Sequence, residues 1–312
     1  ELVRVVLSDV APWTGPELGG TLVTLTGAGV GAVSSLELGC RFGESEVVSA
    51  SVHGGSEARC VSPSSGLGGW TSVELLSDGV ALRSGGSFLY YSRVWVSAVA
   101  PLLGPVEGGT RLTVLGTPFR EAATLRCRFD ERSKTVTARH VGAGQLECAT
   151  PVQSGAGSRA VEVSLNAQQF STSGVGFTYV STVSLSSVWP SRGASEGGTA
   201  VTVHGSGLTA LSEQLGYLQC RFNGTVVSAS GATGTSAVCN STSATGIASV
   251  EVSSNGRDFT TSGVQFELVR VVLSDVAPWT GPELGGTLVT LTGAGVGAVS
   301  SLELGCRFGE SE

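Results

Sequence analysis

The sequence predicts an all-β protein built from small β-sandwiches in tandem. Three observations support this fold class. A motif of a proline followed by Gly-Gly-Thr recurs about every 88 residues. Short segments that alternate apolar and polar residues recur inside each repeat, and one cysteine pair falls in each complete repeat. Short alternating strands with turns between them, in a unit of this size, are typical of a two-layered sandwich.

Repeats set the module boundaries. Residues 267–312 repeat residues 1–46 letter for letter, an offset of 266. The proline of the motif recurs at spacings of 89, 89 and 88 residues, at Pro12, Pro101, Pro190 and Pro278. A phenylalanine closes each complete unit, at Phe88, Phe177 and Phe266. We therefore expect modules at 1–88, 89–177 and 178–266 and a partial fourth at 267–312. Because half a module cannot close a core, we expect a longer array.

Three segments of each module read as strands with one buried face. In the first module they are residues 21–27, 38–42 and 72–76. Their constant apolar positions are predicted to face the core. An arginine on the second segment and a glutamate on the third are predicted to face outward and to form cross-strand ion pairs. These pairs are Arg41 with Glu74, Arg128 with Glu162, and Arg221 with Glu251.

The junctions between modules contain neither glycine nor proline. Residues 89–100 read LYYSRVWVSAVA, and residues 178–189 read TYVSTVSLSSVW. We expect the last strand of one module to run directly into the first strand of the next, which favours a stiff, extended rod. Trp95 is expected to fill a junction.

The cysteines favour disulfides. The pairs Cys40–Cys60, Cys127–Cys148 and Cys220–Cys239 have separations of 20, 21 and 19 residues. Cys306 would be the first member of a fourth pair. A disulfide that closes a loop of about 20 residues contributes roughly 3 kcal/mol. A zinc site is disfavoured because no C-x-x-C occurs and each module has only two thiols. We therefore predict an oxidising compartment, extracellular or at a cell surface.

Two sequons fit that compartment. Asn223-Gly224-Thr225 and Asn240-Ser241-Thr242 match N-x-[ST], and both follow predicted strands of the third module. We expect N-linked glycans at Asn223 and Asn240, and the Ser and Thr content would also suit O-linked glycans. No other cofactor is expected.

Four segments of the second module carry the motifs of a known domain family. Its motifs lie in Val96–Gly116, Cys127–Phe129, Cys148–Pro151 and Val161–Phe170. They read V-x-x-x-x-P-x-x-G-P-x-x-G-G-T-x-x-T-x-x-G, then C-R-F, C-x-[ST]-P and V-E-V-S-x-N-x-x-x-F. Together they resemble the IPT/TIG family of immunoglobulin-like domains, and the resemblance covers the whole chain. The third module departs from it at Ala194 and Thr242, where the first two modules have proline, which affects local turns.

The resemblance implies a fold and several settings. Domains of this family occur in plexin-like and fibrocystin-like receptor ectodomains and in large algal and bacterial surface proteins. They also occur beside some starch-acting enzymes and in some transcription factors. A net charge of −7 argues against the transcription factors, because nucleic-acid binding needs a concentrated basic face. It argues equally against an electrostatic membrane-surface binder.

Nothing in the sequence predicts catalysis. His53, His140 and His204 have no recognisable Ser or Asp partner, and a GxSxG motif is absent. No apolar run is long enough to cross a bilayer, and no secretory signal is visible. Asn255-Gly256-Arg257-Asp258 contains Gly-Arg-Asp rather than Arg-Gly-Asp, and we expect a type I′ turn at Asn255-Gly256. Trp70 is expected to be exposed, and a sugar-stacking role is a further hypothesis for it.

Our leading interpretation is a structural one: a segment of an extracellular glycosylated fibril or stalk whose partner is itself. The alternative is a receptor or adhesin ectodomain that binds a protein or glycan partner. A third interpretation is an accessory domain of a carbohydrate-active enzyme. The segment itself is not expected to be an enzyme.

Overall fold

A computed structural model describes residues 5–33, 37–130, 134–299 and 305–309. The chain is all-β, and the one α-helix among the described residues is the short α1 (Ala210–Gln214) of the third module. The chain divides into two compact units. The first comprises Glu1–Ala100, Arg111–Val152 and Ser158–Phe177, and the second comprises Pro101–Thr110, Gln153–Gly157 and Thr178–Glu312.

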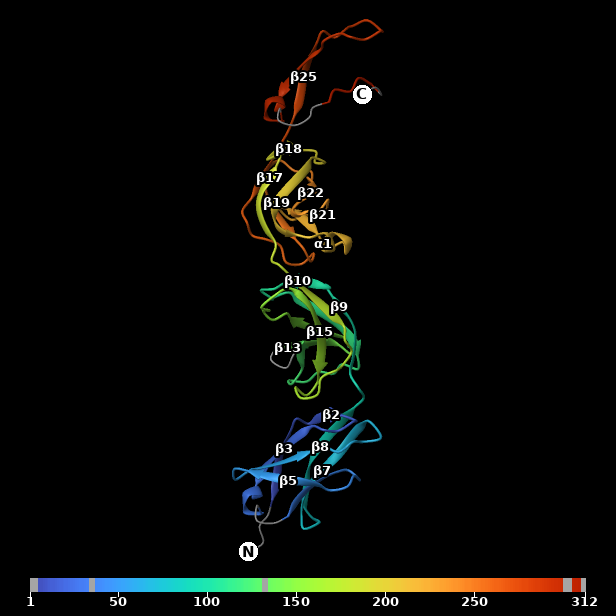
Figure 1. Cartoon of the computed structure of the whole chain (residues 1–312), viewed down its shortest axis with the longest axis vertical. Helices are drawn as coiled ribbons and strands as arrows, with labels where there is room; N and C mark the ends of the chain where they lie inside the picture. The colour runs from blue at the N-terminus through green and yellow to red at the C-terminus, as the bar shows by residue number, and fades with distance from the viewer. Residues whose placement is uncertain (1–4, 34–36, 131–133, 300–304, 310–312) are drawn as a thin grey trace. The chain divides into compact units, whose positions relative to one another are not determined.

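Each complete module has eight strands in the same order. Figure 1 labels several of them in each module. The first module contains β1 (Val6–Ala11), β2 (Thr14–Pro16), β3 (Leu22–Ala28), β4 (Leu38–Phe42), β5 (Val48–His53), β6 (Glu57–Val61), β7 (Gly69–Ser77) and β8 (Val80–Tyr91), with the 3-10 turn η1 (Val30–Val33). Its strand order is β1-β3-β6-β5-β4-β7-β8-β2. All neighbours are antiparallel except the parallel pair β2 and β8.

The second and third modules repeat this order. The second contains β9 (Trp95–Ala100), β10 (Leu103–Pro105), β11 (Arg111–Thr117), β12 (Arg126–Phe129), β13 (Thr135–Gly142), β14 (Gln145–Ala149), β15 (Gly157–Ser164) and β16 (Gly176–Val180). The third contains β17 (Ser184–Trp189), β18 (Arg192–Ala194), β19 (Ala200–Leu208), β20 (Gln219–Phe222), β21 (Thr225–Ser230), β22 (Gly234–Asn240), β23 (Gly246–Ser253) and β24 (Gln265–Val269).

The core of each module is formed by the predicted apolar positions. In the first module, Val23 and Leu25 of β3 pack in one cluster with Val73 and Leu75 of β7, and all four side chains are fully buried. The phenylalanine of the C-R-F segment packs edge to face against the phenylalanine that closes its module. The ring centroids are 5.3, 6.3 and 5.8 Å apart in Phe42–Phe88, Phe129–Phe177 and Phe222–Phe266. This contact explains why both aromatic positions recur.

The Gly-Gly-Thr turn is tied to its own module by a close approach. Gly19 and Gly20 both have positive φ, 73° and 81°, which glycine adopts without strain. The turn brings the Thr21 hydroxyl against Gly15 of β2, where an added Cβ would lie 2.3 Å from Oγ1. Gly193 meets Thr199 in the same way, at 2.4 Å. These positions therefore require glycine.

The partial fourth module keeps its local pairing without a core. β25 (Val272–Ala277) and β26 (Thr290–Ala294) pair in the register of β1 and β3, and η2 (Val296–Val299) repeats η1. Val10 is 7% exposed, whereas Val276, at the identical position, is 39% exposed. The same sequence thus forms the same hairpin, and the other strands of the sandwich are needed to bury it.

The structure corrects several details of the sequence-based picture. The junctions are not continuous strands, because residues 92–94 separate β8 from β9 and residues 181–183 separate β16 from β17. Trp95 does not fill a junction, since it is 48% exposed. The turn at Asn255-Gly256 is not type I′, which needs positive φ at both residues, because only Gly256 has it.

The predicted ion pairs form only in the first module among the described residues. In that module, Nη2 of Arg41 on β4 lies 2.5 Å from Oε2 of Glu74 on β7. Glu162 and Glu251 were expected to face outward, but they are buried, 6% and 7% exposed. They accept hydrogen bonds from neighbouring hydroxyl and backbone groups instead of pairing with arginine.

Candidate functional site

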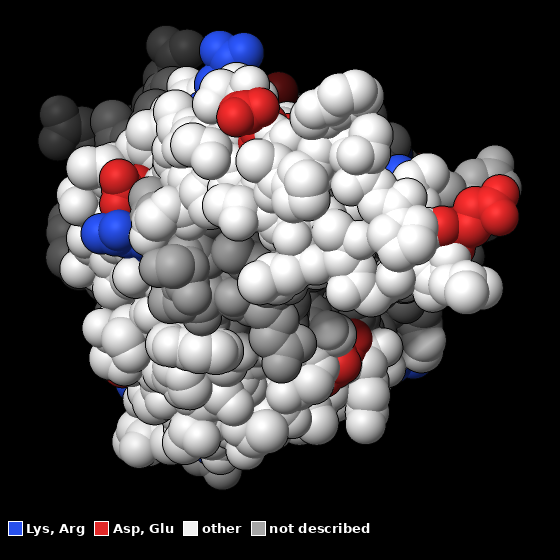
Figure 2. All heavy atoms as spheres, turned by 90° about the horizontal axis from the view of Figure 1, so that it is seen from above, with Lys and Arg blue, Asp and Glu red and all other residues white. Residues whose placement is uncertain are grey.

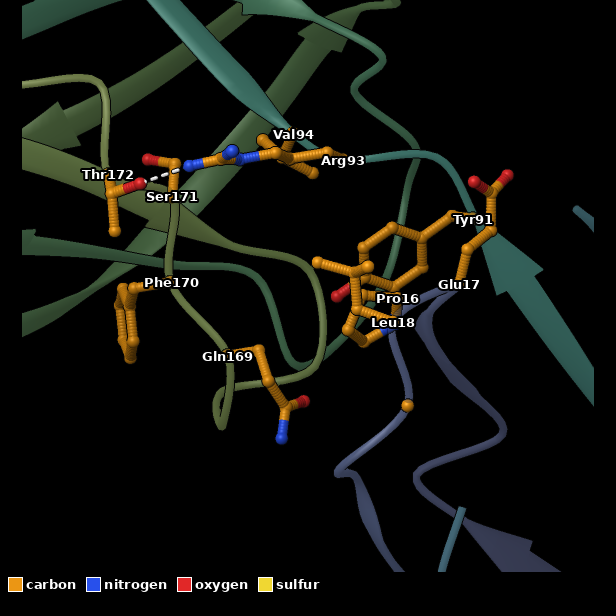
Figure 3. Close-up of a pocket in the computed structure, with 11 residues that line it drawn as sticks. Pro16, Glu17, Leu18, Tyr91, Arg93, Val94, Gln169, Phe170, Ser171 and Thr172 are labelled. Carbon is orange, nitrogen blue, oxygen red and sulfur yellow. Dashed lines mark hydrogen bonds between the residues drawn. The ribbon is translucent and has the colours of Figure 1, made fainter. Parts of the chain in front are cut away.

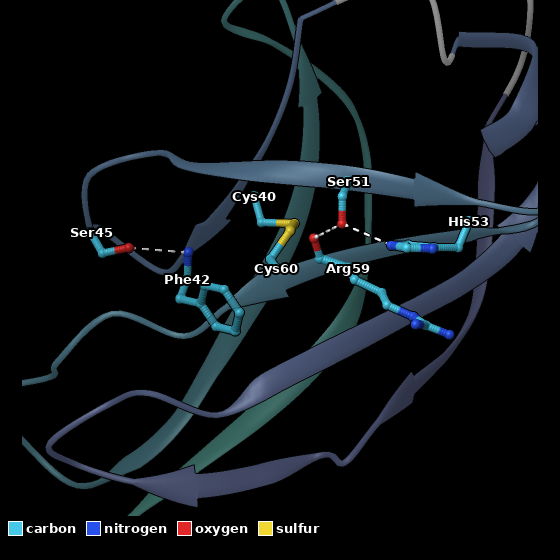
Figure 4. Close-up of a disulfide and its surroundings, with 7 residues drawn as sticks. All are labelled: Cys40, Phe42, Ser45, Ser51, His53, Arg59 and Cys60. Carbon is cyan, nitrogen blue, oxygen red and sulfur yellow. Dashed lines mark hydrogen bonds between the residues drawn. A yellow bond between two sulfur atoms is a disulfide. The ribbon is translucent and has the colours of Figure 1, made fainter.

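Each predicted cysteine pair is a disulfide in the structure, with Cα atoms 6.3, 6.4 and 6.3 Å apart in Cys40–Cys60, Cys127–Cys148 and Cys220–Cys239. Figure 4 shows the first of them linking β4 to β6 beside Phe42. Both sulfurs lie in the core, so these cysteines are structural rather than reactive. Cys306 is a free cysteine and is exposed.

His53 illustrates why the histidines do not form a catalytic site. Its Nε2 lies 3.1 Å from the Ser51 hydroxyl (Figure 4). The two side chains meet because residues i and i+2 of a strand share a face. A nucleophilic serine also needs a group that orients the histidine. Among the described residues, no carboxylate forms an ion pair with His53, whose cross-strand neighbour Glu57 binds Arg59 instead.

Among the described residues, His140 and His204 likewise form no ion pair. His140 lies half-buried on β13, and His204 is exposed on β19. Within the described part of the chain, no cluster of three or more metal-ligating side chains occurs, and no helix is long and apolar enough to cross a membrane. Burial raises the pKa of Tyr90 to about 12, although a hydrogen bond with Ser62 acts to lower it.

The two sequons lie on the surface of the third module. Asn223 occupies the turn between β20 and β21 with φ 51°, and its Oδ1 accepts from the Ser249 amide at 2.9 Å. The Nδ2 atom is the one that carries a glycan, and this arrangement leaves it free to do so. Asn240 is exposed at the end of β22. Both side chains are therefore accessible for modification.

The most distinctive surface feature is a stacked tryptophan pair on the first module. Trp13 precedes β2, and Trp70 is the second residue of β7. Strand β8 lies between β2 and β7, and its Leu89 pairs with Trp70 and donates its backbone amide to the Trp13 carbonyl at 2.8 Å. The indole rings stack with centroids 5.6 Å apart and planes 13° apart. Trp13 is 40% exposed and Trp70 65% exposed.

This pair is specific to the first type of module. The positions that correspond to Trp13 and Trp70 hold Leu102 and Ser158 in the second module. In the third module they hold Ser191 and Ile247. The fourth, partial module repeats the first residue of the pair as Trp279. Sequence reasoning identified Trp70 as exposed but missed Trp13, because its partner lies 57 positions away along the chain.

A cavity of about 530 Å³ lies where the first module meets the second (Figure 3). Pro16, Leu18 and Tyr91 line it from the first module, and Phe170 lines it from the second. Arg93 extends from the connection between the modules to hydrogen-bond the Thr172 hydroxyl. Glu17 is the carboxylate that lines the cavity, and its Oε1 accepts a hydrogen bond from the Ser92 hydroxyl at 3.0 Å. Neither histidine nor cysteine is among the lining residues, so the cavity is a junction feature without a recognisable acid–base pair.

On the face seen in Figure 2, the charged groups are few and scattered among uncharged residues, so charge marks no binding patch on that face. The ion pairs of the described residues are mostly exposed, and such pairs contribute little to stability.

Comparison with known proteins gives a family. The model of the IPT/TIG domain matches residues 6–91, 95–179 and 184–268. Plexin-A3 of Rattus norvegicus is 28% identical over 225 residues, which cover 66% of this chain and 11% of the plexin. Plexin-A4 of Homo sapiens is 32% identical over 170 residues, 51% of this chain and 8% of the plexin. The chain thus spans about a tenth of the length of these relatives.

Among solved structures, the full extracellular region of Plexin A4 has a TM-score of 0.47 at 17% identity and covers 89% of this chain and 26% of that chain. The family that matches is not a catalytic one. With three disulfides and similarity to plexins, the chain is extracellular or exposed at a cell surface.

Proposed function

Since this chain belongs to the IPT/TIG domain family, we propose that it is a segment of a receptor or adhesin ectodomain. Its partner is a protein that docks on the stacked pair Trp13 and Trp70 of the first module. The segment is not itself an enzyme. The first of the tandem modules, at residues 1–88, presents this surface, and the others lie at 89–177, 178–266 and, in part, 267–312. Glycans at Asn223 and Asn240 cover part of the third module. The extended rod stays a prediction, although the continuous junction strands from which it was inferred are interrupted at residues 92–94 and 181–183.

The exposed tryptophan pair is the observation that carries this proposal. Tryptophan is enriched at the energetic centres of protein interfaces, because it buries a large flat area at a low cost in side-chain entropy. Stacking fixes both rings of the pair before any partner arrives, which lowers that cost further. The similarity to plexins supports the same proposal, because plexin-like receptors are one of the settings that the family resemblance implies.

Truncation of the pair tests the proposal. The full chain, unreduced, is used to probe arrays of extracellular proteins and of glycans. Trp70→Ala is expected to abolish binding to a protein partner. Trp189→Ala is the matched control, because Trp189 is also 65% exposed but has no stacking partner among the described residues. Binding that survives Trp70→Ala, or no protein binding at all, would refute the proposal. Binding to glycans alone would contradict a protein partner and would indicate a glycan partner instead.

A fibril or stalk is the second candidate, and one observation favours it. The letter-for-letter repeat of residues 1–46 at 267–312 is what a periodic array would show. The similarity to plexins supports the receptor or adhesin proposal better, so we place the fibril second. Duplication would also copy the tryptophan surface, as Trp279 indicates, so that a repeated receptor segment would bind its partner at several points.

A further inference from the structure

Two sequence motifs that the proposed function does not use meet in the structure. One is the Gly-Gly-Thr turn at residues 19–21 and 108–110. The other is the segment N-x-x-[QD]-F, residues 166–170 of the second module and 255–259 of the third, which we name the clasp loop. In both cases the clasp loop of one module binds the Gly-Gly-Thr turn of the module before it.

The first clasp is a buried hydrogen-bond network. Asn166, 2% exposed, donates from Nδ2 to the Thr21 hydroxyl at 3.1 Å and to the Thr14 carbonyl at 3.3 Å. Thr21, fully buried, donates to Oε1 of Gln169 at 2.9 Å. Gln168 forms two bonds with the backbone of Leu22, accepting its N–H at 2.8 Å and donating to its C=O at 2.9 Å. Side chains of the second module thus form hydrogen bonds with the polar groups at the Gly-Gly-Thr turn of the first module.

The second clasp has the same design with a carboxylate. Asn255, also 2% exposed, directs Nδ2 to the Thr110 hydroxyl at 3.4 Å and to Asp258 Oδ2 at 2.7 Å. The Thr110 hydroxyl donates to the same Asp258 oxygen at 2.5 Å. In both clasps the asparagine Oδ1 accepts the backbone amides two and three residues further on. This Asx turn fixes the loop before it meets its target.

The buried glutamates, and the arginines that stack on phenylalanine rings, hold the clasp loop in place. Glu162 accepts from the Ser171 hydroxyl and from the Ser173 and Gly174 amides, immediately after the loop. Arg128 stacks on Phe170, the last residue of the loop, with its guanidinium carbon 4.2 Å from the ring centroid. Glu251 and Arg221 repeat this arrangement in the third module, where the guanidinium lies 4.3 Å from the Phe259 ring.

The first module has no clasp loop. The corresponding chain is a two-residue hairpin, Asp78-Gly79, with φ 50° and 78°, which joins β7 directly to β8. Its glutamate, Glu74, is engaged by Arg41 instead of holding a loop. Nothing equivalent to Asn166 is therefore available to reach a preceding Gly-Gly-Thr turn.

We propose that the clasp loop is an intramolecular recognition element that locks its module onto the Gly-Gly-Thr turn of the module before it. A module of the first type lacks the clasp loop. The junction between a third-type and a first-type module is therefore the one without a clasp, which we call the free junction. The array is then articulated once per 266-residue period. This inference goes beyond the proposed function and does not depend on the identity of the partner.

Trypsin cleavage after Arg93 tests the lock. Arg93 lies on the connection between the first two modules, and Val94, on the other side of the bond, is buried. In the unreduced full chain, Asn166→Ala is expected to accelerate this cut roughly tenfold or more, because cleavage follows the population of the opened junction. Asn255→Ala, which removes the other clasp, is the matched control and should leave the Arg93 cut unchanged.

A second variant separates an opened junction from an unfolded module. Gln168 is exposed, so Gln168→Ala removes its two bonds to Leu22 without opening the core. It is expected to accelerate the Arg93 cut several-fold while the bonds after Arg126 and Arg128, inside the module, stay uncut. A rate at Arg93 that is the same in wild type and in Gln168→Ala, including no detectable cut in either, overturns the lock.

The free junction is tested in a chain that carries residues 1–266 twice, so that the fourth module is complete. Arg270 then lies on the connection from a third-type to a first-type module. The bond after Arg270 is expected to be cut at least tenfold faster than the bond after Arg93. Equal rates, or a slower cut at Arg270, would contradict the claim that this junction opens more readily than the clasped one.

Discussion

The buried carboxylate of Glu251 gives the sharpest energetic prediction. It accepts hydrogen bonds from the Thr260 hydroxyl, from the amide and hydroxyl of Ser262, and from the Gly263 amide. In Glu251→Gln one acceptor oxygen becomes an NH₂ group that faces donors. A hydrogen bond to a charged group is worth about 1.5–3 kcal/mol, and a buried donor left unpaired costs a further 1–3 kcal/mol. We therefore expect a destabilisation of about 3 kcal/mol.

Amide hydrogen exchange measures this locally, which a global unfolding curve of a multi-module chain does not. A loss of about 3 kcal/mol corresponds to a fall of roughly 100-fold in the protection factors of β20 and β23. The strands of the first module serve as an internal reference. Glu74→Gln is the matched control, because it breaks only the partly exposed pair with Arg41 and should cost less than about 1 kcal/mol. Similar small effects for both variants would show that the buried glutamate has no special role.

The hydrogen bonds to the Glu251 carboxylate predict that the stability of the third module depends on pH. Burial acts to raise the pKa of Glu251, but the four hydrogen bonds outweigh it and hold the pKa below its ordinary value of 4.5. Stability from a lowered pKa is present above the unfolded value and is lost as pH falls through the folded one. Protection of β23 should therefore fall as the pH drops below about 4.5, and Glu251→Gln should flatten that dependence. A steeper fall in the variant would contradict the assignment.

Three further predictions concern stability and modification. Replacing Cys220 and Cys239 together by alanine should cost the third module about 3 kcal/mol, measured by exchange, and an unchanged module would rule out a structural role. Gly15→Ala should destabilise the first module by about 1–3 kcal/mol, because the new Cβ meets a buried threonine hydroxyl, whereas Gly66→Ala, in open space, should be neutral. In protein from a eukaryotic secretory host, intact-mass analysis should show a glycan that Asn223→Gln removes, and identical masses would exclude that site.

The repeating parts of the fold could be predicted from the sequence. Period-two alternation identified the buried faces of β3, β4 and β7 and their counterparts, because a one-sided strand imposes that pattern on every copy. The cysteine spacing pointed to the disulfide pairs for the same reason. The family resemblance was confirmed by the match to three IPT/TIG domains. What recurs in each module is what a single module needs in order to fold.

The features that differ between modules could not be predicted in this way. Alternation placed Glu162 and Glu251 outward, since it cannot reveal that hydroxyl and amide groups nine to twelve residues away will surround a carboxylate. The clasp escaped sequence analysis because Asn166 and Thr21 lie 145 positions apart. Trp13 and Trp70 likewise meet only through the pairing of β2 and β7 with β8.

The central claim is that this chain is part of a receptor or adhesin ectodomain rather than a fibril. Electron microscopy of the native, unreduced protein, at a resolution that shows single modules, tests it most directly. The account predicts discrete molecules of fixed length without end-to-end association between chains. Continuous filaments with an axial period of three modules would contradict it and would establish the fibril instead.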